Sequence, residues 1–243
     1  ENTLEAFSHA VAVGADALEM DVRATADGSL VVIHDATVER TTDASGAVDA
    51  LKLDQLQRLD AGFRWSADGG KTFPFRGKGV RIPTVDEVFA RFPDRRVNLE
   101  IKNPPGAAAA KPLCDRIRAH RMQERMLVAS MSDEAIAAFR GACPEVATSL
   151  ATSEGRAFVF ASYAWLDSAY TPRGVALQVP DRLRDRVLAT PGLVKAAHNR
   201  NLKIHAWTVN DEARMRELVA IGIDGIITDR PDLLARIVGR GRL

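Results

Sequence analysis

Two acidic residues and a histidine occupy positions that would otherwise be apolar. Glu19 and Asp21 alternate with apolar residues between positions 15 and 23, and this period of two predicts a β-strand with both carboxylates on one face. Two carboxylates on one face of a buried strand repel each other, so they need a cation, a proton or a basic partner between them. A metal ion is the simplest such partner. After a turn at Asp27-Gly28, a short return strand ends at His34, which brings an imidazole near the acids.

The segment VNLEIK repeats this pattern. Its apolar residues are expected to face helices, whereas Asn98, Glu100 and Lys102 face the interior. Because catalytic residues gather at the carboxyl ends of barrel strands, Glu19, Asp21 and Glu100 are predicted to form an all-oxygen site for a hard divalent cation, Mg²⁺ or Ca²⁺. The alternative is a structural ion pair between Glu100 and Lys102. We favour a cation and a substrate, because three acids and one lysine on inward positions exceed what mutual pairing needs.

The strand at 203–209 carries two further candidates on a common face, His205 and Trp207. Trp207 lies nearer the carboxyl end and is predicted to floor a ligand pocket, the alternative being a core tryptophan. His205 lies deeper and is expected to be structural. The segment 69–72, Gly-Gly-Lys-Thr, resembles the end of a phosphate-binding loop, but no buried strand precedes it and we give it little weight. No GxSxG or GxGxxG motif supports acyl transfer or dinucleotide binding.

The elements that must position these residues alternate along the chain. Thr3 is a typical N-cap for a helix that ends at Gly14. Alternating strands and helices predict a parallel sheet and favour a TIM (β/α)8 barrel over a doubly wound sheet. We count seven candidate parallel strands, so the first barrel strand is expected upstream of Glu1. After position 83 we predict helices at 84–92, 107–121, 133–140, 190–201, 211–221 and 231–238, and strands at 97–102, 126–130, 146–150, 175–179, 203–209 and 224–228.

A long polar segment at 36–82 interrupts this order just after the second strand. Loops of this length are typically lids or binding insertions, so we expect a small insertion within one barrel domain that spans residues 1–243. The segment contains four aromatic residues, Phe63, Trp65, Phe73 and Phe75. They could give the mouth of a substrate pocket an apolar character.

The composition limits the possible partners. The chain has 33 basic and 32 acidic residues and a formal net charge of +1, so no general electrostatic attraction draws it to nucleic acid or to an anionic membrane. No apolar run is long enough to span a bilayer. Cys114 and Cys143 lack metal-site spacing and are interpreted as packing residues. Unpaired cysteines favour the cytoplasm, while a chain that begins without Met leaves an upstream secretion signal open.

A set of motifs in a fixed order spans nearly the whole chain. Together these motifs resemble the glycerophosphodiester phosphodiesterase family, and in this order they are highly specific although each alone is weak. They are Glu1-Asn2-Thr3-Leu4-Glu5-Ala6-Phe7, Gly14-Ala15-Asp16, Glu19-x-Asp21-Val22, Asp27-Gly28 through Val32-x-His34-Asp35, Arg40-Thr41-Thr42, Ile82-Pro83-Thr84, Asn98-x-Glu100-x-Lys102, Trp207-Thr208-Val209-Asn210 and Gly225-Ile226-Ile227-Thr228-Asp229-Arg230-Pro231.

The resemblance implies a TIM barrel with an insertion after the second strand, and it implies roles for particular residues. Three acids would bind a divalent cation, His34 would be one of two acid/base histidines, and Lys102 and Trp207 would line the substrate site. The implied metal ligands are Glu19, Asp21 and Glu100. One motif of the family is missing, a His-Arg-Gly on the first strand that would supply the other histidine and a phosphate-binding arginine.

The resemblance also implies a reaction. A glycerophosphodiester would be hydrolysed to an alcohol and glycerol 3-phosphate, by attack of the glycerol 2-hydroxyl on phosphorus and opening of the resulting cyclic phosphate by water. The alternatives are a lysophospholipase D-like phosphodiesterase and a binding domain for a phosphate ligand without turnover. A small-molecule substrate is the expected partner. The sequence predicts neither the head-group alcohol nor the oligomeric state.

Overall fold

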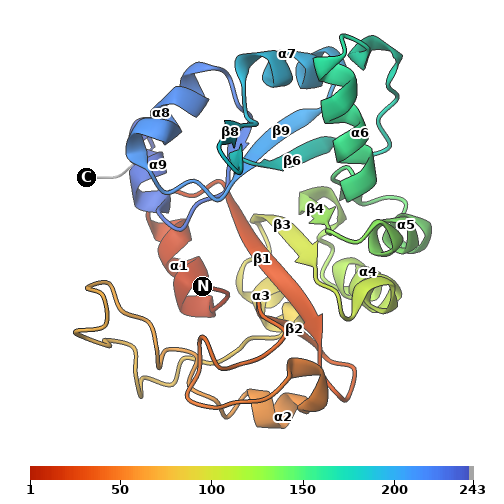
Figure 1. The fold of residues 1–243 in the computed structure, drawn as a ribbon. Coiled ribbons are helices and arrows are strands. Elements are labelled where there is room, and N and C mark those ends of the chain that lie inside the picture. Colours follow the sequence, from red (N-terminus) through yellow and green to blue (C-terminus); the bar gives the residue numbers. More distant parts are fainter. Residues whose placement is uncertain (241–243) are drawn as a thin grey trace.

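The computed structural model describes residues 1–240, and its centre is a curved parallel sheet (Figure 1). Five strands pair in the order β2-β1-β3-β4-β5 and three in the order β10-β9-β6. A parallel bridge between Ser149 and Ala176 links the two groups. No strand pairing joins β10 to β1 within residues 1–240. The parallel strands are β1 (Ala17–Ala24), β3 (Arg96–Ile101), β4 (Met126–Ala129), β5 (Ala147–Thr148), β6 (Ala176–Pro180), β9 (Lys203–Trp207) and β10 (Gly225–Ile226).

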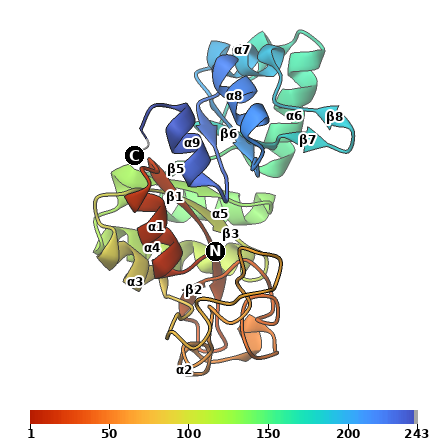
Figure 2. The ribbon, with the colours of Figure 1, turned by 90° about the vertical axis from the view of Figure 1, so that its left-hand side faces the viewer.

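Helices surround this sheet on its outer side (Figures 1 and 2). They are α1 (Leu4–Ala12), α3 (Val85–Arg91), α4 (Ala110–Ala119), α5 (Asp133–Ala142), α6 (Thr152–Tyr163), α7 (Pro191–Asn199), α8 (Glu212–Ala220) and α9 (Pro231–Ile237), with 3₁₀ turns η2 (Gly106–Ala109), η3 (Gln123–Arg125) and η4 (Asp167–Ala169). Five of the helices begin where an N-cap oxygen accepts an N–H of the first turn. These caps are Thr3, Thr84, Ser132, Thr190 and Asp211. The predicted helix start at Thr3 is thereby confirmed.

Alternate side chains of β1 and β3 point to opposite faces of the sheet, so one set forms the core and the other set faces the candidate site. In β3 the side chains of Val97, Leu99 and Ile101 are buried, and in β1 those of Leu18, Met20 and Val22 are buried. These residues pack in one hydrophobic cluster with side chains of α3, α4 and α5. The intervening residues of both strands face inward, as the period of two predicts.

Residues 36–82 form a compact unit beside the carboxyl end of β1, at the lower edge of Figure 1. The unit contains η1 (Val48–Ala50) and α2 (Leu53–Leu56). It shares a small core with the end of β2 (Leu30–Val32), which pairs antiparallel with β1. That core consists of Val31, Ile33, Val38, Val48, Leu56 and Ile82. The long segment is therefore a packed insertion that contacts the barrel through β2.

The two cysteines correct one expectation. Cys114 of α4 and Cys143, which follows α5, form a disulfide with their Cα atoms 5.6 Å apart. Both residues are fully buried, as packing residues would be, but they are not free thiols. The sequence could not show this, because 29 positions separate them and only the contact between α4 and α5 brings them together. The argument for the cytoplasm from unpaired cysteines therefore fails.

Two further differences lie in the second half of the chain. The predicted strands at 146–150 and 224–228 reduce to β5 and β10, each of two residues. A two-stranded hairpin, β7 (Arg182–Leu183) and β8 (Arg186–Val187), follows β6 and was not predicted. Among residues 1–240 no helix combines the length and apolar character that crossing a bilayer requires.

Candidate active site

The three predicted acids meet on two adjacent strands, β1 and β3. Glu19 lies opposite Asn98 and Asp21 lies opposite Glu100 in the parallel register of β1 and β3. Oxygen atoms of Glu19, Asp21 and Glu100 lie within 4.8 Å of one another. Asp21 is buried, with 4% of its surface exposed, and the other two acids are partly buried. Three carboxylate oxygens at this spacing are a suitable donor set for Mg²⁺ or Ca²⁺.

Lys102 supplies positive charge to the same cluster. Its Nζ lies 2.9 Å from Asp21 Oδ1 and 2.9 Å from Glu100 Oε2. Burial acts to lower the pKa of Lys102, but the carboxylates of Asp21 and Glu100 outweigh burial and the net shift is upward. Burial, with repulsion from Asp21 and Glu100, raises the pKa of Glu19 to about 8. The ion pair considered as the alternative is present, but Lys102 contacts only Asp21 and Glu100 and leaves Glu19 without a basic partner among the contacts of the described residues.

Asn2 fixes the orientation of Asp21. Its Nδ2 donates to Asp21 Oδ2 at 2.8 Å, and its Oδ1 accepts the backbone N–H of Asp21 at 3.2 Å. Asn2 has a φ of 51°, a conformation that asparagine tolerates better than most residues. Sequence reasoning quoted Asn2 within a motif but gave it no role. No sequence pattern places Asn2 beside Asp21, because 19 positions separate the two residues.

His34 lies at the end of the return strand, and its side chain is 53% exposed. Its Nδ1 lies 2.7 Å from Asp35 Oδ1. Arg40 Nε donates to Asp35 Oδ2 at 2.5 Å, and Arg40 also donates to both carboxylate oxygens of Glu1. The hydrogen bond from Arg40 is the main reason that the pKa of Asp35 falls to about 2. The sequence predicted His34 but not this chain of charged partners.

The buried side chain of Arg23 connects the His34 backbone to the segment that follows β3. Arg23 of β1 donates from Nε to the His34 carbonyl at 2.9 Å and from Nη1 to the Pro104 carbonyl, also at 2.9 Å. Burial lowers the pKa of Arg23. This side chain therefore connects the ends of β2 and β3, which carry His34 and Glu100. Its inward position in β1 resembles that of Asp21, but its function could not be predicted without the backbone positions.

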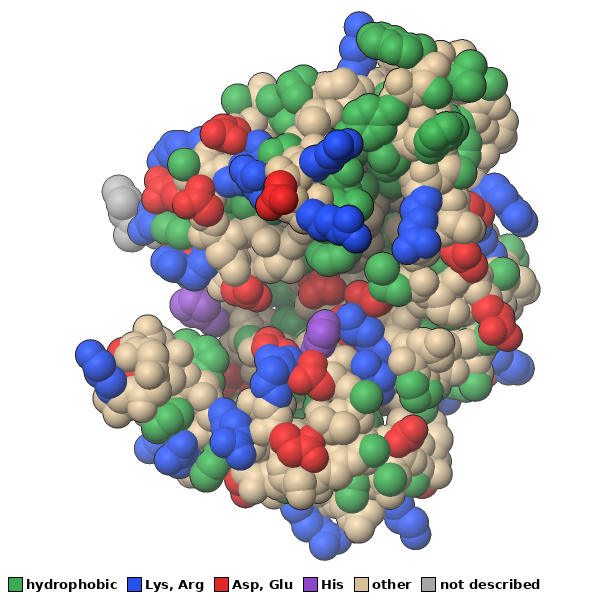
Figure 3. All heavy atoms as spheres, in the orientation of Figure 1, with side chains coloured by type: hydrophobic (Ala, Val, Ile, Leu, Met, Phe, Trp, Pro, Cys, Tyr) green, Lys and Arg blue, Asp and Glu red, His purple; other side chains and the backbone are tan. Residues whose placement is uncertain are grey.

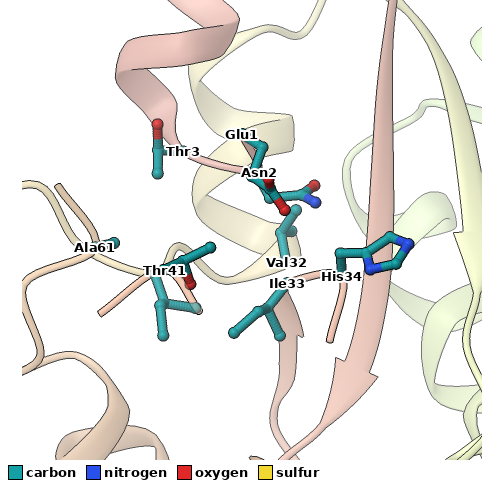
Figure 4. A pocket seen from close by; sticks show the side chains of 9 residues that line it. Glu1, Asn2, Thr3, Val32, Ile33, His34, Thr41 and Ala61 are labelled. Atoms are coloured by element: carbon teal, nitrogen blue, oxygen red, sulfur yellow. The ribbon is translucent and has the colours of Figure 1, made fainter. Parts of the chain in front are cut away.

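The pocket beside His34 lies between the N-terminal segment and the insertion. It is lined by Glu1, Asn2, Thr3, Val32, Ile33, His34, Thr41, Ala61 and Ile82. Figure 4 shows the His34 ring directed away from Thr41 and Ala61 and on the same side as the Asn2 amide. Figure 3 shows acidic, basic and histidine side chains around a hollow in the middle of the visible face. Charged and titratable groups thus gather where the sheet strands end.

The two candidates on β9, Trp207 and His205, lie at different depths in the strand, as expected. Trp207 is the last residue of β9 and is partly buried, whereas His205 lies two positions deeper. Gln178 Nε2 lies 3.2 Å from His205 Nδ1 and donates to Asn98 Oδ1 at 3.0 Å. Burial lowers the pKa of His205, which favours the neutral imidazole. His205 is therefore held in a polar layer with Gln178 and Asn98, at the level of Glu19, and the sequence analysis missed Gln178 as a member of that layer.

The Gly-Gly-Lys-Thr segment is not brought to the site. It forms an exposed turn around Asp68, whose carboxylate accepts the backbone N–H groups of Lys71 and Thr72 at 3.0 Å and 2.9 Å. Those donors already bond a carboxylate, so they do not cradle a phosphate. The low weight given to this motif is justified.

Comparison with known proteins gives a consistent result. The sequence pattern of the glycerophosphoryl diester phosphodiesterase family matches residues 1–233. A glycerophosphodiester phosphodiesterase of Caldanaerobacter subterraneus is 33% identical over 247 residues, which cover 99% of this chain and 93% of the relative. The match therefore includes both the barrel and the insertion.

Solved structures agree in fold. A glycerophosphodiester phosphodiesterase of Agrobacterium tumefaciens superposes with a TM-score of 0.77 at 26% identity, covering 98% of this chain and 93% of that one. A phosphodiesterase of Oleispira antarctica, solved with its product sn-glycerol-3-phosphate, has a TM-score of 0.77 at 24% identity and covers 98% and 91%. The predicted TIM barrel is confirmed by this likeness.

Proposed function

This chain belongs to the glycerophosphoryl diester phosphodiesterase family and is a phosphoric diester hydrolase, and on that premise we propose a metal-dependent reaction at the cluster of acids. The substrate is a small glycerophosphodiester, and the products are an alcohol and glycerol 3-phosphate. The meeting of Glu19, Asp21 and Glu100 within 4.8 Å is the observation that carries this proposal. The product in the Oleispira antarctica structure supports the substrate class.

The residues at the site fit a hard divalent cation. Glu19, Asp21 and Glu100 offer only oxygen donors, and Asn2 holds Asp21 in place by two hydrogen bonds. These residues would hold Mg²⁺ or Ca²⁺, which would neutralise charge at the phosphodiester oxygens and would favour ionisation of the attacking glycerol 2-hydroxyl. Lys102 adds a permanent cation, because its pKa is raised further above neutrality by the acids. The phosphorus oxygens gain negative charge in the transition state, so this positive charge lowers the barrier.

His34 is the proposed acid/base residue. Its Nδ1 is engaged by Asp35, so its Nε2 is the atom left to exchange a proton with the substrate. Proton transfer to the departing alkoxide is needed because an alkoxide is a poor leaving group. His120 and His198 do not serve, because His120 follows α4 and His198 lies in α7, outside the sheet, where they bond Asp86 at 2.8 Å and Asp224 at 2.7 Å. Trp207 at the end of β9 is the proposed wall of the substrate pocket.

The aromatic residues of the insertion are only partly covered. Arg76 lies over the rings of Phe63 and Phe73, with its Cζ atom at 4.1 Å and 3.9 Å from their centroids, and Trp65 packs edge-on against Phe75. Arg76 therefore covers Phe63 and Phe73, whereas Trp65 and Phe75 remain 46% and 39% exposed and leave an apolar surface on the insertion. The lysophospholipase D-like reaction is therefore the second candidate.

The test is release of glycerol 3-phosphate from glycerophosphocholine and glycerophosphoethanolamine, with Mg²⁺, with Ca²⁺ and with chelator. Both this chain and a form extended upstream are assayed, because the family's His-Arg-Gly motif has no counterpart in residues 1–243. We expect metal-dependent release by the extended form and loss of release in its His34→Ala variant, with Asp54→Asn as a matched surface control. Full activity of the His34→Ala variant, or full activity in chelator, contradicts the proposal.

A further inference from the structure

Large apolar side chains gather without cover at the end of α6 and in the turn that follows. Trp165 is 90% exposed and Phe160 is 74% exposed, and Tyr163 and Leu166 are exposed as well. Single exposed apolar residues are ordinary, whereas four large ones within a short segment form a contiguous surface. Figure 3 shows hydrophobic side chains gathered over α6 on the face that holds the central hollow. We name Phe160, Tyr163, Trp165 and Leu166 the apolar patch.

The residue types in the apolar patch are those of a lipid interface. Trp and Tyr have rings that are apolar with one polar atom, and they are enriched where a bilayer meets water. Phe and Leu provide area that can enter the acyl region. Arg156 precedes Phe160 by four positions and Tyr163 by seven, so the three share one face of α6. A basic residue thus accompanies the apolar side chains on the exposed side of the helix.

The hairpin at 182–187 adds a local positive charge. Arg182, Arg184 and Arg186 are exposed, and Leu183 between them is 59% exposed. The exposed acid of the hairpin is Asp185 alone. Figure 2 shows the hairpin projecting from the same side of the molecule as α6. We name residues 182–187 the basic hairpin.

We propose that the apolar patch and the basic hairpin dock this face of the protein on an anionic lipid bilayer. The net charge of the chain is only +1, so attraction to such a surface must be local, and the basic hairpin supplies it. A second copy of the chain is the other possible occupant of the apolar patch, and the experiment below distinguishes it from a bilayer. The docking is peripheral and places the hollow at the lipid surface.

The experiment is sedimentation with vesicles of phosphatidylcholine alone and of phosphatidylcholine with phosphatidylglycerol. One double variant, Phe160→Ser with Trp165→Ser, tests the apolar patch. A second double variant, Arg184→Glu with Arg186→Glu, tests the basic hairpin. The matched controls are Val219→Ser and Arg58→Glu, which alter an exposed apolar residue of α8 and an exposed arginine of the insertion. Thermal melts verify that each variant is folded. Hydrolysis of water-soluble glycerophosphocholine is measured in parallel, in the form found active, and does not depend on vesicle binding.

We expect binding to the anionic vesicles and about fivefold weaker binding for each arginine removed, with release by high salt. The apolar variant should bind at least tenfold more weakly, and both controls should bind like the parent chain. Unchanged hydrolysis of glycerophosphocholine separates docking from the reaction itself. The proposal is overturned if the parent chain stays in the supernatant, if both double variants still sediment, or if the patch instead mediates a concentration-dependent dimer that Trp165→Ser abolishes.

Discussion

His34 Nδ1 lies 2.7 Å from Asp35 Oδ1, and the other oxygen of Asp35 accepts a hydrogen bond from Arg40 Nε at 2.5 Å. A carboxylate in this position holds the imidazole in one tautomer and one orientation. Arg40 in turn bonds Glu1, so the carboxylate is itself held on its far side. The proposed acid/base residue is therefore oriented by a chain of charges that the barrel core does not provide.

Asp35→Asn should lower kcat in the form found active. The amide keeps the shape of the side chain but weakens both its bond to His34 and its ion pair with Arg40, so we expect a decrease of about 10- to 100-fold. KM should change less than twofold, because Asp35 orients the histidine and does not touch the substrate. Steady-state kinetics on glycerophosphocholine measures both, with Asp54→Asn as control. A kcat equal to that of the parent would exclude the orienting role.

The same aspartate should make stability depend on acid pH. The pKa of Asp35 is about 2 in the folded chain against an ordinary 3.8, so its stabilising contribution is present above 3.8 and is lost as pH falls toward 2. The difference in free energy of unfolding between parent and Asp35→Asn should be constant above about pH 5 and shrink between pH 4 and 2. Urea unfolding at several pH values measures it. A difference that does not change with pH would show that the ion pair with Arg40 contributes nothing.

Mg²⁺ or Ca²⁺ should raise the melting temperature, and chelator should reverse the effect. At one hundred times the dissociation constant the ligand adds about 2.7 kcal/mol, or about 5 to 10 °C for a chain of this length. Glu100→Gln should remove most of the increase, because it takes one ligand from the cluster. Glu212→Gln, on the outer helix α8, is the control and should respond like the parent. An equal increase in the Glu100 variant would place the ion elsewhere.

Replacing both Cys114 and Cys143 by alanine should reduce stability without changing kcat. The disulfide closes a loop of 29 positions, and losing such a constraint on the unfolded chain costs about 3 to 4 kcal/mol. Urea unfolding with and without reductant tests this, and reductant should leave the double variant unaffected. Thiol titration of the unreduced, unfolded parent should find no free cysteine. Two reactive thiols would restore the original interpretation of both residues as packing side chains.

The meeting of three acids was predictable, because strand periodicity determines it. Glu19, Asp21 and Glu100 were identified because alternation sets which side chains share a face, and the parallel register then brings them together. Arg40 and Gln178 were missed as partners because their contacts join segments whose approach depends on the insertion and on the order of the barrel strands. The disulfide was missed for the same reason. The hairpin after β6 was not predicted, because its turn contains neither Gly nor a strong turn pair. Arg184 adopts the positive φ at that turn.

Arg23 lies between the barrel and the insertion, two parts of the molecule that could evolve at different rates. It anchors the His34 carbonyl to the barrel, while the insertion beyond His34 has a small core of its own. Exchanges of side chains on the rim of the insertion leave that anchor, and the carboxylates of β1 and β3, in place. The sequence of the insertion can therefore change while the anchor of His34 and the three carboxylates keep their positions.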